Sequence, residues 1–211
     1  MLAELQLVRR ADAKASCRAA GAGGVESAGT LVERARAGDS DAFQTIFNRH
    51  ARPVFGFIYN CIGNRDLAEE LLQETFVRAY RRLDTVRDEA LLATWLFGIA
   101  RNVVREAIKE KYRCKRNVAL ESGLDVADGA ARPDAAVISA DLAAEMRRVL
   151  GALKEDQRVV FVLKLLYDMS YEQIGRITGS SIGKLKTDLH RARLEMRRRL
   201  RPYLGDAADG R

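Results

Sequence analysis

The feature that most constrains this chain is a short helix, a glycine turn and a long basic helix within residues 170–204. Ser170 can cap the first helix, and Gln173, three positions later, would complete a capping box. Gly179 fits the turn because glycine adopts the left-handed backbone that a sharp helix exit requires. The second helix is expected to be capped by Ser180 or Ser181 and to bury Ile182, Leu185, Leu189, Ala192 and Met196. This pattern predicts a helix-turn-helix.

The second helix of this motif is also strongly basic. Between Lys184 and Arg201 there are eight basic and two acidic residues, within a chain whose net charge is +7. Such a helix, set behind a short first helix, fits the DNA major groove and can neutralise phosphates. A solvated basic helix on a helical protein of another kind is the plainer alternative.

Cysteine usage and hydropathy exclude several classes of protein. Cys17, Cys61 and Cys114 are odd in number and far apart, which argues against a disulfide framework and against a zinc site. A reducing cytoplasm is the simplest setting for such a chain. No apolar run reaches membrane-spanning length, and no metal or cofactor is expected.

Helical periodicity extends over most of the chain, and no strand pattern appears. We expect an extension over 1–29, a helical domain over 30–113, a linker over 114–138, a second domain over 139–204 and a tail over 205–211. The predicted fold is all-α: two small helical domains joined by a flexible linker, the second a winged-helix-like helix-turn-helix. Within the first domain a kink is expected at Pro53, and Thr94 is expected to cap a helix that ends near Arg113. The segment 154–167 is apolar nearly all round, as expected for the central helix of a small bundle.

Two charge patterns in the first domain suggest binding surfaces. Acidic and amide residues crowd the first half of a predicted helix over 67–83, with arginines in its second half; this order suits the helix dipole but also makes a compact acidic patch. On the next helix Arg101, Arg105, Lys109 and Arg113 recur every four residues and form a drifting basic stripe. For each of the two patterns, a charged helix face that contacts only water remains an alternative interpretation.

Two blocks of sequence resemble a known family. The stretches LAEELLQETFVRAY (67–80) and TWLFGIARN (94–102) resemble the second conserved region of bacterial sigma-70 family factors, in the small extracytoplasmic-function (ECF) subgroup. The stretches LKEDQRVVF (153–161), YEQIG (171–175) and LHRAR (189–193) resemble that subgroup's fourth region. The resemblance covers about residues 31–113 and 139–201.

The resemblance implies a dissociable initiation subunit of RNA polymerase that recognises promoter −35 and −10 elements and promotes DNA melting. Its core-polymerase contacts would fall on Asp66, Glu69, Glu70, Gln73, Glu74 and Phe76. Its −10 contacts would fall on Arg87, Trp95, Arg101, Asn102, Arg105 and Lys109. Its −35 contacts would fall on Ser181, Lys184, Lys186, Thr187, His190, Arg191, Arg193 and Arg197. A positive groove with aromatic platforms suits a melted strand, although Trp95 as a plain core residue is an equal alternative.

The resemblance also implies partners and carries some departures. Core RNA polymerase, promoter DNA and an anti-sigma factor are the expected partners. Lys154 stands where the family often has proline, Gly175 where alanine is usual, and Asp188 where a basic residue is common. A helix-turn-helix regulator that binds duplex DNA without polymerase is the main alternative. An enzyme is not expected, since His50 and His190 lie in different domains and no phosphate-cradling glycine loop occurs.

Overall fold

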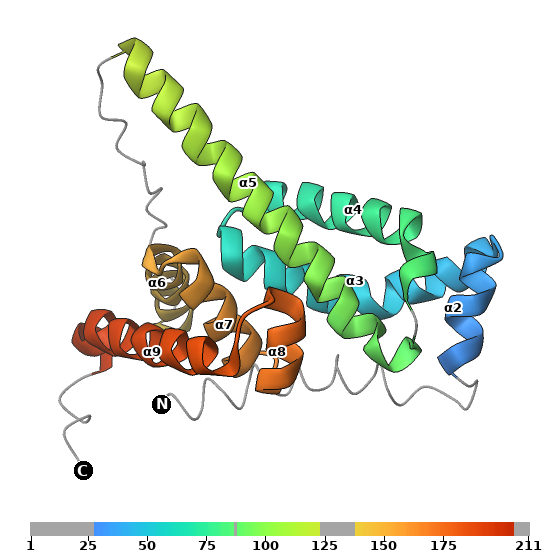
Figure 1. The fold of residues 1–211 in the computed structure, drawn as a ribbon. Helices are drawn as coiled ribbons and strands as arrows, with labels where there is room; N and C mark the ends of the chain where they lie inside the picture. The colour runs from blue at the N-terminus through green and yellow to red at the C-terminus, as the bar shows by residue number, and fades with distance from the viewer. Residues whose placement is uncertain (1–27, 87, 123–137, 205–211) are drawn as a thin grey trace.

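The structure, a computed structural model, describes residues 28–86, 88–122 and 138–204. A first group of helices comprises α2 (Ala28–Arg36), α3 (Ser40–Ile62), α4 (Arg65–Arg81) and α5 (Leu92–Ser122), with 3-10 turns η1 (Leu83–Thr85) and η2 (Glu89–Leu91) before α5. A second group comprises α6 (Ile138–Ala152), α7 (Glu155–Leu165), α8 (Tyr171–Thr178) and α9 (Ile182–Leu204) (Figure 1). No strand occurs among the described residues, and the all-α prediction is confirmed. Residues 1–27 of the predicted extension, 123–137 of the predicted linker and the predicted tail lie outside the described residues. The last two residues of the predicted extension, 28–29, instead begin α2, and residues 114–122 of the predicted linker continue α5.

The boundaries of α3 and α4 are set by short polar caps and a glycine turn. The Asp39 carboxylate accepts hydrogen bonds from the backbone N–H groups of Asp41 and Ala42 and so opens α3. Gly63 closes α3 in the left-handed conformation, with φ of 79°, and the Asn64 side chain then caps α4. Helix α3 runs through Pro53 as one continuous element.

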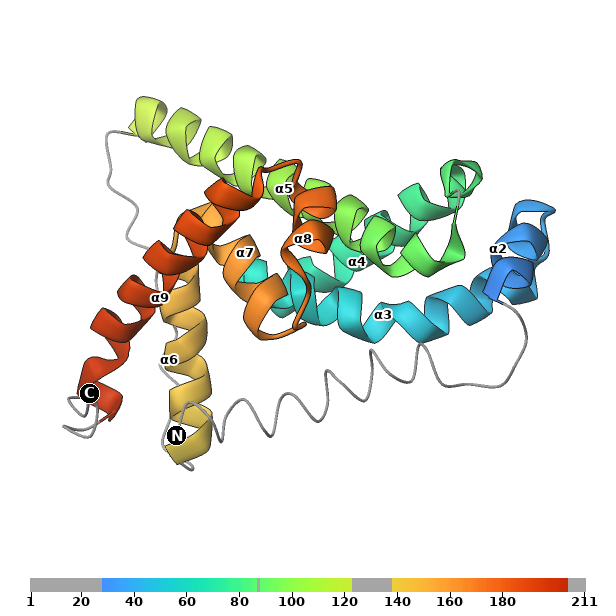
Figure 2. The same ribbon diagram turned by 60° about the horizontal axis from the view of Figure 1, so that its bottom comes forward.

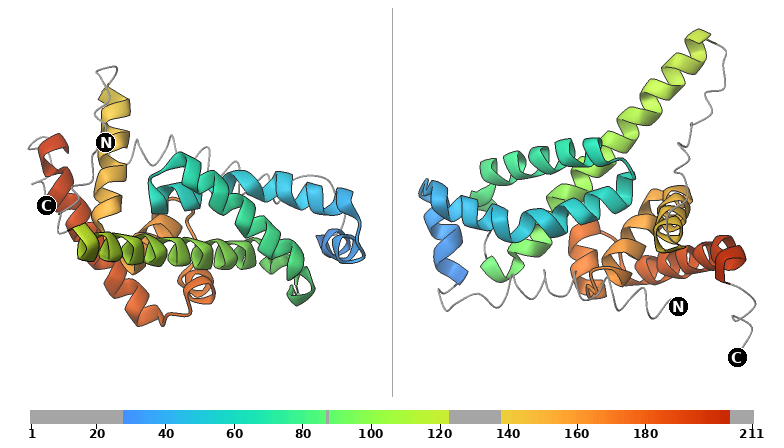
Figure 3. Two further views of the ribbon diagram at one scale, coloured as in Figure 1. Left: turned by 90° about the horizontal axis from the view of Figure 1, so that it is seen from above. Right: turned by 180° about the vertical axis from the view of Figure 1, so that it is seen from behind.

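Helix α5 differs from its predicted bounds at both ends. It begins at Leu92 rather than at Thr94, because the Asp88 carboxylate caps η2, which leads directly into α5. Thr94 is instead buried inside the helix. At its other end α5 continues past Arg113 to Ser122. This C-terminal part of α5 projects away from the other helices (Figure 3).

Aromatic side chains fill the contacts between the helices of the first group. Phe47 and Phe76 join α3 to α4 with ring centroids 4.7 Å apart. Phe57 and Phe97 join α3 to α5 with centroids 5.5 Å apart, in an edge-to-face arrangement. Such pairs stabilise a core beyond the area they bury, by roughly 0.5–1.5 kcal/mol each.

Helix α7 is the centre of the second group. Its residues Val159, Val160, Phe161, Val162 and Leu163 are all buried. Five consecutive buried positions point in every direction around a helix, so α7 needs neighbours on all sides. It packs on α9 and α8 in its own group and on α3 of the first group, which confirms its predicted central role.

The helix-turn-helix forms from α8 and α9, with the predicted caps. Ser170 and Gln173 make a reciprocal capping box at the start of α8. Gly179 ends α8 with φ of 71°, and the Ser181 hydroxyl caps α9 by accepting from the Lys184 N–H at 3.4 Å. One prediction is wrong: Ile182 is 41% exposed rather than part of the buried stripe, whereas Leu185, one turn later, is fully buried.

The two groups of helices pack directly against each other. Helix α8 lies along α5, and α7 along α3 (Figure 2). At the centre of this contact the Tyr167 hydroxyl donates to the Pro53 carbonyl oxygen at 2.7 Å, and its ring meets Phe97 edge-on at 5.1 Å. The tyrosine fits because residue 56 is glycine: a Cβ atom there would lie 2.7 Å from the Tyr167 hydroxyl oxygen.

Arg158 of α7 forms a second set of polar contacts between the two groups of helices. Its guanidinium group donates to the carbonyl oxygen of Cys61, in the last turn of α3, and to those of Gly151 and Leu153, at the end of α6. A cation is favoured at helix C-termini, where carbonyl groups have no partners within the helix. One arginine therefore joins the ends of two helices that belong to different groups.

We expect Gly56→Ala to loosen the contact between the two groups without weakening α3. Alanine stabilises a helix interior by roughly 0.5–1 kcal/mol relative to glycine, but its Cβ would displace the Tyr167 hydroxyl. Small-angle scattering should therefore give a larger radius of gyration for this variant.

Two controls accompany this measurement. Gly98→Ala on α5 adds a Cβ that meets no atom within 4 Å and should leave the radius unchanged. In a Tyr167→Phe background the clashing oxygen is absent, so Gly56→Ala should have a smaller effect. An unchanged radius for Gly56→Ala alone would contradict the role given to Tyr167.

Candidate nucleic-acid and polymerase interface

One face of α4 is acidic and open to solvent. Five of the six residues predicted to bind the polymerase core are exposed there, namely Asp66, Glu69, Glu70, Gln73 and Glu74. Glu69 pairs with Arg65 at 3.0 Å and Glu74 with Arg78 at 2.6 Å. Exposed pairs of this kind contribute only about 0–1 kcal/mol, so these carboxylates remain available to a partner.

Phe76, the sixth predicted core-binding residue, is not on this surface. It is 4% exposed, because its ring packs between α3 and α4 against Phe43 and Phe47. The prediction that Phe76 contacts the polymerase core directly is therefore corrected: in this structure the Phe76 ring holds α4 against α3.

Sequence reasoning missed an apolar groove beside the acidic face. A cavity of about 580 Å³ lies between α3 and α4, bounded by Phe43, Phe47 and Phe76. Val77 and Tyr80 line it and are 43% and 56% exposed. Their spacing of three on α4, outside the buried stripe, was the signal available in the sequence.

A larger cleft lies where η1, η2 and the start of α5 meet α8. It has a volume of about 850 Å³. Trp95 and Asn102, both predicted −10 residues, line it; Trp95 is half-buried, combining a core contact with a wall of the cleft. Arg176 and Ile177 of α8 also line it, so both groups of helices contribute. Predicted residue Arg87 lies outside the described residues.

Helix α2 holds the segment that forms one wall of this cleft. The Arg36 side chain donates to the Leu83 carbonyl oxygen at 3.1 Å. The Glu89 carboxylate accepts from the Val32 N–H at 3.2 Å. These bonds fix both ends of the segment between α4 and α5, and Glu89 had no assigned role in the sequence.

The basic stripe of α5 is present, but its members have different neighbours. Arg105 lies 3.9 Å from Glu155 at the start of α7. Arg101 donates to the neighbouring Asn102 and lies close enough to Asp156 to influence its ionisation. Lys109 is exposed on the outer part of α5. The stripe therefore faces both solvent and the second group of helices.

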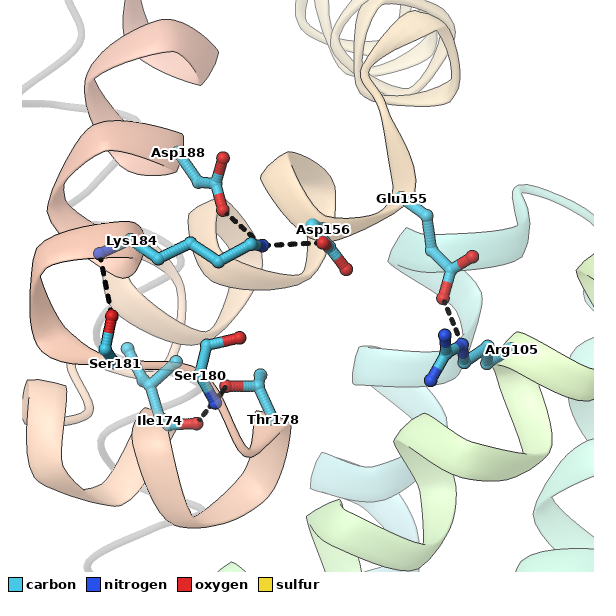
Figure 4. A network of polar contacts seen from close by, with 9 residues as sticks. All are labelled: Arg105, Glu155, Asp156, Ile174, Thr178, Ser180, Ser181, Lys184 and Asp188. Atoms are coloured by element: carbon cyan, nitrogen blue, oxygen red, sulfur yellow. Dashed lines mark hydrogen bonds and ion pairs between the residues drawn. The ribbon is translucent and has the colours of Figure 1, made fainter.

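Lys184, predicted to read the −35 element, already forms ion pairs with two carboxylates of the chain. Its ammonium group donates to Asp156 of α7 at 2.6 Å and to Asp188 of α9 at 2.8 Å (Figure 4). These hydrogen bonds raise the pKa of Lys184, and the bond from Lys184 is the main reason that the pKa of Asp156 is lowered. The position of Asp188 is thereby explained: it is 7% exposed and pairs with Lys184 rather than lying on the outer face of α9.

The remaining predicted −35 residues lie on the open face of α9. Ser181 serves as the cap of α9, and Lys186 lies over the Tyr171 ring at 5.8 Å. The others are exposed: Thr187, His190, Arg191, Arg193 and Arg197. They form the part of the basic helix that is free to approach DNA.

The described residues hold no metal centre and no membrane span. No three of their histidine, cysteine or acidic side chains are grouped as metal ligands. Among the described helices, none combines the length and hydropathy needed to cross a bilayer.

Comparison with known proteins identifies both groups of helices. Residues 46–114 match the family model of sigma-70 region 2, and residues 143–196 match that of sigma-70 region 4. The ECF RNA polymerase sigma factor SigW of Bacillus subtilis is 33% identical over 178 residues, which cover 81% of this chain and 95% of that protein. The ECF RNA polymerase sigma-E factor of Escherichia coli is 28% identical over 181 residues, covering 82% of this chain and 94% of that protein.

A solved structure is also similar. The sigma factor RpoE of Bartonella quintana, in complex with the anti-sigma factor NepR, superposes with a TM-score of 0.61 at 25% identity, covering 75% of this chain and 96% of that one. A second solved structure, CnrH in complex with the cytosolic domain of CnrY, has the same TM-score at 23% identity, covers 82% of this chain and 96% of that one, and supports the fold. The two matched regions, in the order region 2 then region 4, and the 33% identity to an ECF sigma factor place this chain in the ECF group of the sigma-70 family of RNA polymerase sigma factors.

Proposed function

We propose that this chain is a dissociable initiation subunit of RNA polymerase, which binds the core enzyme, recognises the −35 and −10 elements of promoters and promotes DNA melting. The observation that carries the proposal is the family membership over two regions, joined to a surface of suitable charge in each. The protein would act where polymerase and chromosome lie, in the cytoplasm, and would contribute no catalytic step of its own.

The acidic face of α4 is assigned to the polymerase core. Asp66 and Glu70 support this assignment most directly, since both are exposed and neither has an ion pair among the described residues. The apolar groove at Val77 and Tyr80 adjoins this face and offers an aromatic contact next to the charges. A central aromatic anchor with polar residues at its rim is typical of a specific protein interface.

The cleft at the start of α5 is assigned to the melted −10 strand. Trp95 provides an aromatic wall, Asn102 a polar edge and Arg101 a nearby cation. Single strands bind where aromatic platforms lie beside a positive track, and an extruded base needs a pocket. Arg105 and Lys109 continue the positive track along α5.

The open face of α9 is assigned to the −35 element. In a helix-turn-helix the N-terminal part of the second helix reads base edges in the major groove. Lys186, Thr187, His190 and Arg191 occupy that part, with Arg193 and Arg197 placed for phosphates. Lys184 is the weaker candidate, since two carboxylates already hold it.

A protein partner that inhibits the chain is also proposed. The similar structure of RpoE from Bartonella quintana is a complex with the anti-sigma factor NepR, which supports a partner of that class here. The alternative, a regulator acting on duplex DNA without polymerase, leaves the match to region 2 and the acidic face of α4 unexplained.

Run-off transcription tests the proposed function. Purified protein, core polymerase free of other sigma factors and the DNA upstream of the protein's own operon should yield a discrete transcript that depends on the protein. Tight binding to that DNA without polymerase, and no transcript with it, would favour the regulator instead.

Reversing the charge of the α4 face, with Glu70→Lys and Glu74→Lys together, should reduce affinity for the core enzyme by at least about tenfold, since like charges across an interface cost several kcal/mol. The fold should survive, because the one ion pair lost is exposed. Core binding is measured by pull-down and the fold by circular dichroism. Glu33→Lys with Glu110→Lys, on exposed positions of α2 and α5, makes the same change of charge elsewhere; an equal loss in that control would remove the assignment.

Arg191→Ala should weaken promoter binding by the holoenzyme by about 1–3 kcal/mol if Arg191 reads a base edge, and by less if it contacts a phosphate. The measurement is promoter occupancy by footprinting at fixed salt. Arg199→Ala is the matched control, because Glu195 already holds the Arg199 guanidinium at 2.5 Å. Equal occupancy for Arg191→Ala and the unaltered protein would place the reading face elsewhere on α9.

A further inference from the structure

Two adjacent carboxylates lie where the second group of helices meets α5. Glu155 and Asp156 form the first turn of α7. Glu155 faces Arg105 of α5 at 3.9 Å, and Asp156 binds Lys184 of α9 at 2.6 Å (Figure 4). The positive charges of Arg101 and Arg105 also act on Asp156 and contribute to the lowering of its pKa. A single acidic turn is thus in contact with basic residues from both DNA-binding helices.

These basic residues are the ones that DNA would need. Arg101 and Arg105 belong to the stripe assigned to the −10 strand, and Lys184 belongs to the helix assigned to the −35 element. A cation that neutralises a phosphate gains affinity by releasing counterions. When a carboxylate of the same chain already neutralises it, that gain is lost, because the carboxylate must first be displaced.

The same packing also narrows access to the −10 cleft. Arg176 and Ile177 of α8 line the cleft together with Trp95 and Asn102. A strand entering along α5 would therefore meet α8. The Tyr167 contact at Pro53 and the Arg158 contact at Cys61 hold this arrangement in place.

Helix stability alone accounts for part of this arrangement. Acidic residues in a first turn favour the helix dipole, by roughly 0.3–1 kcal/mol each, wherever the helix points. That effect does not explain why both carboxylates are directed at basic residues of α5 and α9, one of them at hydrogen-bonding distance.

We propose that Glu155 and Asp156 form an internal substitute for DNA phosphate, which holds the two DNA-binding helices closed against each other in the free protein. In this state the chain binds promoter DNA poorly, while the acidic face of α4 stays open to polymerase. Opening the contact between α7 and α5 exposes both DNA surfaces together. The inference rests on the proposed function for its biological meaning, but the masking itself is a property of the free chain.

The test uses the full-length free protein and probes that require no known promoter. Glu155→Gln with Asp156→Asn keeps size and hydrogen bonding and removes both charges. Fluorescence anisotropy with a labelled oligothymidylate should show about tenfold tighter binding than for the unaltered protein. The salt dependence should steepen by about 0.7 for each phosphate gained on a single strand, hence by about 1.4 if Arg101 and Arg105 are both released.

A matched control separates masking from net charge. Glu33→Gln with Asp41→Asn removes two exposed carboxylates on α2 and α3, away from the contact with α7. It should leave affinity near that of the unaltered protein. An equal gain in this control, or no gain in the Glu155 and Asp156 variant, would overturn the proposal.

A second variant opens the contact without altering charge. Gly56→Ala should also tighten oligothymidylate binding if it enlarges the radius of gyration. A larger radius without tighter binding would show that closure does not mask DNA binding, and would overturn the proposal. Failure of the proposed function would appear separately, as an absent run-off transcript, while these binding measurements stood unaffected.

Discussion

The burial of α7 on all its sides is the constraint from which most of this architecture follows. Five successive apolar residues, from Val159 to Leu163, leave no polar face that water could cover. Helices α8 and α9 cover part of this surface, and α3, from the other region of the chain, covers the rest. The contact between regions 2 and 4 is therefore continuous with the core of region 4. Arg158 and Tyr167, on the two sides of that contact, add polar bonds that fix its geometry.

The distribution of charge on α9 has a consequence for DNA binding. Its formal excess of basic residues overstates the charge that is free, because carboxylates of the chain hold several of them. Asp156 and Asp188 hold Lys184, and Glu195 holds Arg198 and Arg199, whose hydrogen bonds lower the pKa of Glu195 to about 2. The exposed basic residues of α9 that are not held in these pairs are Lys186, Arg191, Arg193, Arg197 and Arg201. Three of them lie in the N-terminal half of the helix. Electrostatic affinity is thus concentrated where base edges are expected to be read.

The acidic and basic surfaces differ in how open they are. The acidic face of α4 is fully on the outside, whereas the basic stripe of α5 and the first turn of α9 are in contact with α7. With the surfaces as proposed, this arrangement would favour an order of binding, with the polymerase core first and promoter DNA second. The order arises from packing and charge within one chain, and it requires no additional sensing domain.

The sequence by itself determined most of the helices, several of their caps and the two regions, but neither end of α5. Ser170, Gln173 and Gly179 act locally, through bonds and backbone angles that span a few residues, so their effects can be read from spacing alone. Only the tertiary structure decided whether the side chains of four residues are buried, exposed or paired, namely Phe76, Ile182, Lys184 and Asp188. The family resemblance made Phe76 a contact residue, whereas its neighbours on α3 show that it packs inside. Ile182 is exposed although it continues the apolar stripe of α9, and the Lys184 ammonium group is already paired because Asp156, 28 residues earlier, is brought to it by α7. Contacts over such separations depend on how helices pack, which no local pattern of residues specifies.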